Sequence, residues 1–393
     1  MSSLRIAAQA RDATRRALTL LSIMIPVRPL VGPARANIQV SNRCNFDCIM
    51  CPYHSRLAGE VDRFGTGLMD TAVAARVLKG AARIGVDVVT LSGKGEPLLH
   101  PELGQIVRMA RSYGLRPEVF TNGSLLTQRR MEELIEAGLY RLRVSLVGAS
   151  PESHVRYHPN ASRDLFGHIV HSLELFQQLK RRAGATAPQL DLHFIVLAGS
   201  SHEVERMVNL GIELGAESIH LTPLRNRFVG EIGSLAPSRD EEGRIVERLH
   251  DLTPRAARAG LETNIDEIRV YYLYGPMSRV YPCYAGWFDV PVSADGTIMF
   301  CPGCATALGN VRERPLEEIW RSAKYQALRR SLINPLERAK IANCECDRCC
   351  HFCANWRIAR RLASIGLAPM ACAALHYYGR HLPGSRTDGQ PGH

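Results

Sequence analysis

The stretch Arg43-Cys44-Asn45-Phe46-Asp47-Cys48-Ile49-Met50-Cys51-Pro52 contains three cysteines, at spacings of four and three residues. The next cysteine in the chain is Cys283. A loop this short can direct three thiolates at one metal centre, and thiolate sets suit zinc or iron–sulfur clusters. The residues alone leave two alternatives open. One is a closed zinc site in which His54 is the fourth ligand, and the other is a cluster with three protein ligands.

The loop follows a predicted strand at residues 37–41, and Cys44-x3-Cys48-x2-Cys51 resembles the signature of the radical S-adenosylmethionine (radical SAM) enzymes. In that family the three cysteines hold three irons of a [4Fe–4S] cluster, and SAM chelates the fourth. The resemblance implies reductive cleavage of SAM to a 5′-deoxyadenosyl radical, which abstracts a hydrogen atom. Met50 stands where the family usually has an aromatic residue, and its thioether can also pack on adenine.

Size and charge set the limits of the fold. The chain has 393 residues, 46% of them apolar and 22% charged, which allows one large domain and a smaller one. The net charge is +11, with arginine clusters that are usually solvated surface. Binding to nucleic acid is not expected, because no motif interleaves aromatic and basic residues. Two clumps of cysteine separated by a long gap favour two metal regions in a reducing cytoplasm.

The N-terminal segment, residues 1–36, is predicted to be a basic helix with a Pro-rich lead-in. Its apolar run at 17–27 imitates a signal peptide but is too short to span a bilayer. Export would also separate the protein from SAM and low-potential electrons. We expect this helix to pack against the body, with peripheral contact to a membrane surface as the alternative.

Strands and helices are predicted to alternate from residue 37 to residue 225. The pattern indicates an α/β fold with a parallel sheet and right-handed crossovers, and glycines follow four of the helices as expected for C-caps. Six strands match the partial (β/α)6 TIM-like barrel of the radical SAM core, in which function gathers at the carboxyl ends of strands. The predicted strands are 37–41, 86–92, 116–121, 141–146, 189–196 and 218–222, and the predicted helices are 71–84, 101–113, 128–136, 166–182 and 203–214.

After the second predicted strand comes Leu91-Ser92-Gly93-Lys94-Gly95-Glu96-Pro97-Leu98. Glycines there allow the backbone to approach a ligand closely, although a simple strand-ending turn has the same sequence. The stretch resembles the family's Gly-Gly-Glu motif, which holds the SAM amino group, with Lys94 in place of the middle glycine. The resemblance makes Gly93, Gly95 and Glu96 expected SAM-binding residues.

Further SAM contacts are expected at the ends of the third and fourth strands. Asn122, in Thr121-Asn122-Gly123, belongs either to a simple loop or to the SAM site. Ser145 and Arg156 match a family stretch whose serine and arginine contact the SAM ribose and carboxylate, and the planar fork of arginine suits a carboxylate. His154 and His158 are either substrate-side groups or surface histidines. Leu224 backs the adenine or is a core residue.

A polar linker and a helix at 239–259 occupy residues 226–282, where no chemistry is predicted. Beyond them, Cys283-x12-Gly296-x4-Cys301 surrounds an Asp295-Gly296 hairpin turn. A second group of cysteines spans 344–353, and a zinc knuckle there would not explain the hairpin cysteines. An Arg-rich helix and a Gly/Pro-rich end form the tail, residues 354–393.

This arrangement, at 283–353, is similar to the SPASM and twitch extensions of radical SAM enzymes. The resemblance assigns Cys283, Cys301, Cys346 and Cys349 to one auxiliary [4Fe–4S] cluster of the twitch kind. The remaining cysteines form a second cluster or stay as thiols near the first: Cys304, Cys344, Cys350, Cys353 and Cys372.

The resemblance implies an oxidoreductase that takes electrons from a flavodoxin- or ferredoxin-type partner. We expect it to dehydrogenate a small-molecule alcohol, sugar or aminocyclitol, with the auxiliary cluster as electron acceptor and a base that the sequence does not identify. One alternative is maturation of a ribosomal peptide. Another is epimerisation of a sugar or peptide, with Cys304 returning the hydrogen. Outside this class stands a zinc- or cluster-binding module that contacts RNA.

Overall fold

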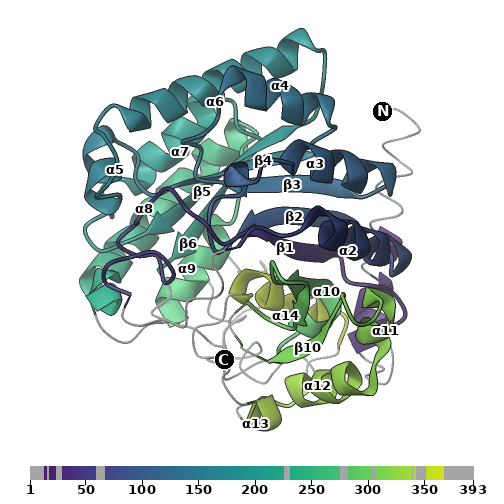
Figure 1. Ribbon diagram of the computed structural model, residues 1–393. Helices are drawn as coiled ribbons and strands as arrows, with labels where there is room; N and C mark the ends of the chain where they lie inside the picture. Colours follow the sequence, from purple (N-terminus) through teal and green to yellow (C-terminus); the bar gives the residue numbers. More distant parts are fainter. Residues whose placement is uncertain are drawn as a thin grey trace, which may run out of the picture.

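The computed structural model describes residues 13–15, 17–23, 29–58, 67–224, 231–274, 282–302, 304, 306–338, 340–341 and 351–366. Within them, ten strands form one sheet in the order β10-β9-β8-β1-β2-β3-β4-β5-β6-β7. The sheet curves, and helices cover its outer side (Figure 1). This is the mixed α/β, partial-barrel architecture that the sequence predicts.

The strands from β1 to β7 run parallel, and each successive strand pairs with the one before it. All six predicted strands and all five predicted helices are present, with ends that differ by at most two residues. The strands are β1 (Arg35–Ser41), β2 (Val88–Gly93), β3 (Arg116–Thr121), β4 (Arg141–Leu146), β5 (Gln189–Val196), β6 (Ser218–Pro223) and β7 (Glu262–Thr263). The helices are α2 (Thr71–Arg83), α3 (Leu103–Ser112), α4 (Gln128–Glu136), α5 (Pro151–Tyr157), α6 (Leu165–Arg182), α7 (Val204–Glu213), α8 (Arg239–Arg258) and α9 (Ile265–Tyr274), with short 3-10 turns η1 (Pro97–Leu99) and η2 (Glu231–Leu235).

The two faces of the sheet differ in chemistry. In β1, Ala36, Ile38 and Val40 are fully buried against the helices. Arg35 and Asn37 alternate with them and are half-buried on the concave side. The same alternation occurs in β4 and β6. Because side chains alternate across a strand, the polar residues of these strands share the inner face, which gives the barrel a polar interior.

The C-terminal part of the chain extends the same sheet. Strand β8 (Asp289–Val292) pairs in parallel with β1, and Arg35 lies opposite Asp289. The predicted Asp-Gly turn is present, with Gly296 at φ 90°, and joins β8 to β9 (Thr297–Met299). The other elements are β10 (Ala307–Asn310), α10 (Ala285–Phe288), α11 (Leu316–Arg321), α12 (Ala323–Ile333), α13 (Pro335–Arg338) and α14 (Phe352–Ser364).

Residues 17–23 are helical and pack against the body, as predicted. Ile23 is fully buried, and the carbonyl oxygen of Ser22 accepts a hydrogen bond of 3.1 Å from the Trp287 indole. This contact ties the N-terminal helix to α10. In the described part of the chain, no helix has the length and apolar character needed to cross a bilayer.

Candidate functional site

The three-cysteine loop lies at the carboxyl end of β1 and is held by hydrogen bonds from two sides. The backbone N–H of Ile49 donates to the carbonyl oxygen of Tyr157 at 3.0 Å. The Asn160 amide donates to the carbonyl oxygen of Asn45 at 2.9 Å, and its backbone N–H donates to Asp47. The end of α5 and the residues after it therefore fix the conformation of the cysteine loop.

Burial and mutual repulsion make the three thiols poor acids without a metal. Burial raises the pKa of Cys44 to about 11, and burial followed by the neighbouring thiols Cys51 and Cys44 raises the pKa of Cys48. Burial also raises the pKa of Cys51. Cationic iron stabilises thiolates and releases their protons on binding, so this donor set fits a cluster.

A mononuclear zinc site fits less well. Among the described residues, no three His, Cys, Asp or Glu side chains converge closely enough to hold one metal ion. His54, the alternative fourth ligand, instead makes a 3.0 Å hydrogen bond with the carbonyl oxygen of Lys94. A cubane binds its thiolate ligands at separate irons, so a set of three cysteines with no fourth protein ligand suits that arrangement.

Gly93 and Gly95 pack against the backbone that leads into the cysteine loop. A Cβ on Gly93 would overlap the carbonyl oxygen of Ser41, and one on Gly95 would overlap that of Arg43. The N–H groups of Gly95 and Glu96 donate to these same two carbonyls, at 3.1 and 2.7 Å. The close approach that the sequence predicts for these glycines is therefore made here to the protein's own backbone.

Glu96 is 98% buried, and its carboxylate accepts three hydrogen bonds. The donors are the Leu98 N–H at 2.9 Å, the Thr121 hydroxyl at 2.6 Å and the Asn122 N–H at 2.7 Å. Burial raises its pKa to about 7, against the opposing effect of these hydrogen bonds. Since a carboxylate has about four acceptor positions, one remains for a ligand. The Leu98 bond caps the local turn, and the other two hold the segment after β2 against the end of β3.

Asn122 extends this brace to the cysteine loop. Its side-chain amide donates to Asn45 Oδ1 at 3.0 Å, and Asn45 donates in turn to Ser124 at 2.8 Å. The residues predicted to bind SAM after β2 and β3 thus contact the loop that carries the cysteines.

Ser145 and Arg156 lie at the same edge of the sheet. Ser145 is near the end of β4 and pairs in register with His193 of β5. Arg156 is in the last turn of α5, and its guanidinium lies 5.8 Å from the Tyr157 ring centre and beside Gly199. Within the described residues, this guanidinium has no ion-pair partner, so its donors are available to a carboxylate.

His154 and His158 are neither surface nor substrate-side groups. They are 1% and 2% exposed, their rings stack at 4.2 Å, and the Phe46 ring lies 4.9 Å from that of His158. The two histidines therefore pack against the cysteine loop through Phe46. Met50 and Leu224 belong to one small apolar cluster beside the loop, which suits both interpretations of Leu224.

The second cysteine region is described in part. Cys283, Cys301, Cys304 and Cys353 are buried or half-buried, whereas Cys344, Cys346, Cys349, Cys350 and Cys372 lie outside the described residues. The Asn355 amide donates to the Cys283 sulfur at 3.9 Å.

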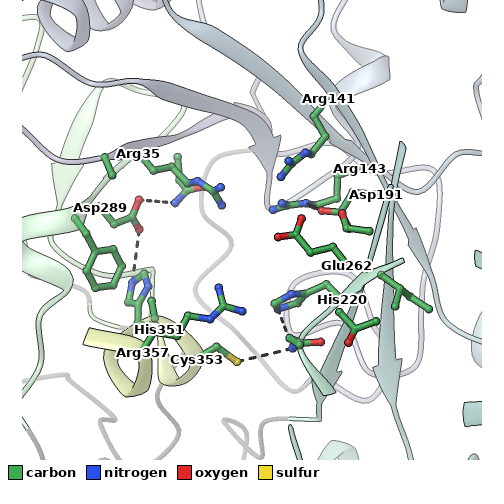
Figure 2. A pocket seen from close by; sticks show the side chains of 18 residues that line it. Arg35, Arg141, Arg143, Asp191, His220, Glu262, Asp289, His351, Cys353 and Arg357 are labelled. Carbon is green, nitrogen blue, oxygen red and sulfur yellow. Dashed lines mark hydrogen bonds and ion pairs between the residues drawn. The ribbon is translucent and has the colours of Figure 1, made fainter. Parts of the chain in front are cut away.

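A cavity of about 470 Å³ opens on the concave face at the amino ends of the strands. Figure 2 shows Arg35 and Asp289 on one side of it, Arg141, Arg143 and Asp191 on the other, and Cys353 below. Asn264 and Glu262, from a region where the sequence predicts no chemistry, also line it. No sequence motif marks these residues; only the strand alternation indicates that β1 and β4 turn polar groups inward.

A partial parallel barrel with three half-buried cysteines after its first strand, and further cysteines beside the amino ends of its strands, is the arrangement of an iron–sulfur, SAM-dependent radical enzyme. Residues 38–187 match the sequence model of the radical SAM superfamily. Residues 283–350 match the SPASM iron–sulfur cluster-binding domain. The chain is a radical SAM enzyme with a C-terminal SPASM domain, and its cofactors are SAM, the [4Fe–4S] cluster that binds it, and SPASM auxiliary clusters.

Two curated relatives span most of the chain. An AdoMet-dependent heme synthase of Methanosarcina barkeri is 27% identical over 79% of this chain and 88% of its own. A PqqA peptide cyclase of Gluconobacter oxydans is 28% identical over 72% of this chain and 75% of its own.

Solved structures share the fold. Streptococcus suis SuiB bound to S-adenosylmethionine superposes with a TM-score of 0.61 at 16% identity, over 82% of this chain and 73% of its own. Native anSMEcpe with bound AdoMet has a TM-score of 0.61 at 17% identity, over 86% of this chain and 99% of its own.

Proposed function

We propose that this enzyme modifies a peptide by hydrogen abstraction, and not the small-molecule alcohol that we first expected. Support comes from the relatives: one is a PqqA peptide cyclase, SuiB has been solved with its precursor peptide SuiA, and anSMEcpe with a Cp18Cys peptide. The product formed from the accepted peptide would show whether the reaction is a crosslinking or an oxidation.

In this proposal Cys44, Cys48 and Cys51 hold the SAM-binding cluster, and Cys283, Cys301, Cys346 and Cys349 hold an auxiliary one. When bound, the first cluster and SAM supply a carbon radical that abstracts hydrogen. Arg156 and Ser145 orient the SAM carboxylate and ribose. Glu96 and Asn122 hold the end of β3 against the cysteine loop, and Gly93 and Gly95 keep the SAM-side backbone close to it.

The observation that carries the proposal is the cavity along β1. The cysteine loop follows the carboxyl end of this strand, and the cavity with Cys353 on its wall lies at the amino end. A substrate in the barrel interior would therefore lie between the two cysteine regions. The interior wall is polar, as hydrogen bonding to peptide groups requires.

The test uses the anaerobically reconstituted enzyme with SAM, a flavodoxin-type reductant and a library of short synthetic peptides. We expect one peptide to stimulate 5′-deoxyadenosine formation and to lose hydrogen, as seen by mass spectrometry. The Cys44→Ala variant is the control that abolishes both signals. SAM cleavage that no peptide stimulates, with a sugar alcohol oxidised instead, would overturn the proposal.

A heme-forming reaction is the second candidate, because the heme synthase relative covers the larger share of both chains. The same reconstituted enzyme distinguishes it: heme extracted after turnover with an iron porphyrin precursor would favour this reaction over peptide modification. Either activity would need SAM and low-potential electrons, so a cytoplasmic location is part of this proposal.

A further inference from the structure

The cavity in Figure 2 is lined by an unusual number of arginines. Arg35 extends from β1, and Arg141 and Arg143 extend from β4 on the facing wall. All three approach one carboxylate, Glu118 of β3, at 3.6, 3.3 and 3.8 Å. Three guanidiniums around one carboxylate repel each other, so the cluster carries more positive charge than Glu118 balances.

The positive groups face the cavity and the negative groups lie behind them. The side chains of Arg35, Arg141 and Arg143 are 35%, 19% and 16% exposed, whereas those of Glu118 and Asp191 are 1% and 4% exposed. A ligand that passes Glu262 at the rim therefore reaches these guanidinium groups before it reaches Glu118 or Asp191. This layering favours an anionic group over a cationic one.

The guanidiniums also have unused donors. Arg143 donates from Nε to Asp191 at 2.7 Å, but its Nη2 is 3.8 Å from Glu118, beyond hydrogen-bond length. The Arg35 guanidinium makes no hydrogen bond within the described residues, and its ion pair of 3.6 Å with Glu118 is also too long to be one. Arg141 donates a 2.6 Å hydrogen bond to the side-chain oxygen of Gln189. These side chains are partly exposed to the cavity, and a ligand with planar acceptor oxygens would give their guanidinium nitrogens acceptors.

The other charged groups of the cavity wall are mostly engaged. Asp289 accepts a 2.6 Å hydrogen bond from Asn37 and lies 3.6 Å from His351. Arg357 donates to Glu267 at 2.5 Å. Glu262 is exposed at the rim, and His220 stacks on His193 at 5.4 Å. Asp289 lies opposite Arg35 in the β1–β8 pair and offsets part of its charge, while one of its oxygens is taken by Asn37.

We propose that Arg35 and Arg143 bind a carboxylate of the substrate at the amino ends of β1 and β4. This inference rests on the proposed peptide function and specifies it: the modified segment carries an acidic side chain or ends in a free carboxyl group. Arg141 holds the wall in place through Gln189 and Glu118. The carboxylate would then anchor the substrate at the end of the cavity far from the cysteine loop.

The test uses calorimetry to measure how tightly three N-acetylated tripeptides bind to the anaerobic, cluster-loaded enzyme with SAM. They are acetyl-Gly-Glu-Gly-amide, acetyl-Gly-Gln-Gly-amide and acetyl-Gly-Gln-Gly with a free carboxyl end. We expect at least one carboxylate peptide to bind about tenfold more tightly than the uncharged one, as for a hydrogen bond to a charged group. Which of the two binds identifies the source of the carboxylate.

Substitutions at Arg35 and Arg143 test whether these residues cause the preference for a carboxylate. In Arg35→Gln and in Arg143→Gln the tenfold preference should fall to within about twofold, and Arg35→Lys should keep part of it, because it keeps the charge but not the planar fork. Arg35→Gln breaks no hydrogen bond, so it is the variant expected to fold normally, as iron content and melting temperature will show. Arg239→Gln, at an 82% exposed arginine on α8, is the matched control and should keep the full preference.

Equal binding of the charged and uncharged peptides, or a preference that survives both Arg→Gln substitutions, would refute the carboxylate site. Glutarate is a further probe. Binding of glutarate that Arg35→Gln abolishes, without binding of any peptide, would keep the carboxylate site and reject the peptide function. SAM cleavage measured in the same variants shows that the cysteine loop is intact.

Discussion

Replacement of Glu96 by alanine tests whether this residue acts mainly as a brace. The substitution removes the acceptor of hydrogen bonds from the Leu98 N–H, the Thr121 hydroxyl and the Asn122 N–H, at 2.9, 2.6 and 2.7 Å. All three donors lie around a side chain that is 98% buried, so water does not readily replace the carboxylate.

A buried donor that loses its acceptor costs about 1–3 kcal/mol. Three such losses do not add fully, and we expect Glu96→Ala to lower the free energy of unfolding by about 3–5 kcal/mol. Asp70→Ala is the matched control, because Asp70 is also a carboxylate N-cap, accepts from the Ala72 N–H at 2.7 Å and is exposed. Loss of an exposed cap costs about 1 kcal/mol.

The assay is anaerobic urea unfolding of the iron-free proteins, followed by tryptophan fluorescence, with iron content measured after reconstitution. We expect Glu96→Ala to lose both stability and the iron of the cysteine loop, since Glu96 and Asn122 hold that loop. A Glu96→Ala protein as stable as Asp70→Ala, with full iron and weakened SAM binding, would refute the brace and make Glu96 a SAM ligand only.

Three further outcomes follow from the structure. Gly95→Ala should destabilise the fold by about 3 kcal/mol through overlap with the Arg43 carbonyl, whereas Gly243→Ala, in open space on α8, should stabilise it slightly in thermal melts. Burial lowers the pKa of His154 to about 3, so below pH 6.5 the unfolded chain binds a proton that the folded chain does not. The free energy of unfolding should therefore fall by up to about 1.4 kcal/mol per pH unit as the pH drops from 6.5 towards 3. A His154→Leu variant that keeps this slope in acid unfolding would contradict the assignment. Cys44→Ala should lower bound iron by about four atoms per chain, as one cubane requires, and an unchanged iron count would exclude a cluster there.

Much of the barrel was predictable because its signals are local. Strands β3, β4 and β5 begin and end at the predicted residues, since each is a short apolar-alternating run closed by a turn. The glycines expected after helices, such as Gly85 and Gly138, adopt positive φ values of 79° and 83°. The cysteine loop was predictable for the same reason, because its spacing is a property of ten consecutive residues.

The cavity was not predictable, because its walls come from distant parts of the chain. Arg35 and Asp289 become neighbours only when β8 pairs with β1, a register that no local pattern encodes. Asn264 follows the two-residue strand β7, and its side-chain oxygen accepts a 2.8 Å hydrogen bond from the Leu221 N–H. No sequence pattern indicates this role. The burial of His154 and His158 likewise depends on the packing of α5 against Phe46.

The pairing of β8 with β1 has a mechanical consequence. One strand of seven residues, about 23 Å at the usual rise per residue, has the cysteine loop beyond one end and the auxiliary region hydrogen-bonded along the other. Strand β1 therefore keeps the cysteine loop and β8 in a fixed relation. Neither can move relative to the other without breaking the hydrogen bonds between Arg35–Ile38 and Asp289–Val292. Substrates are therefore accommodated by the side chains of the interior and not by separation of these two parts of the sheet.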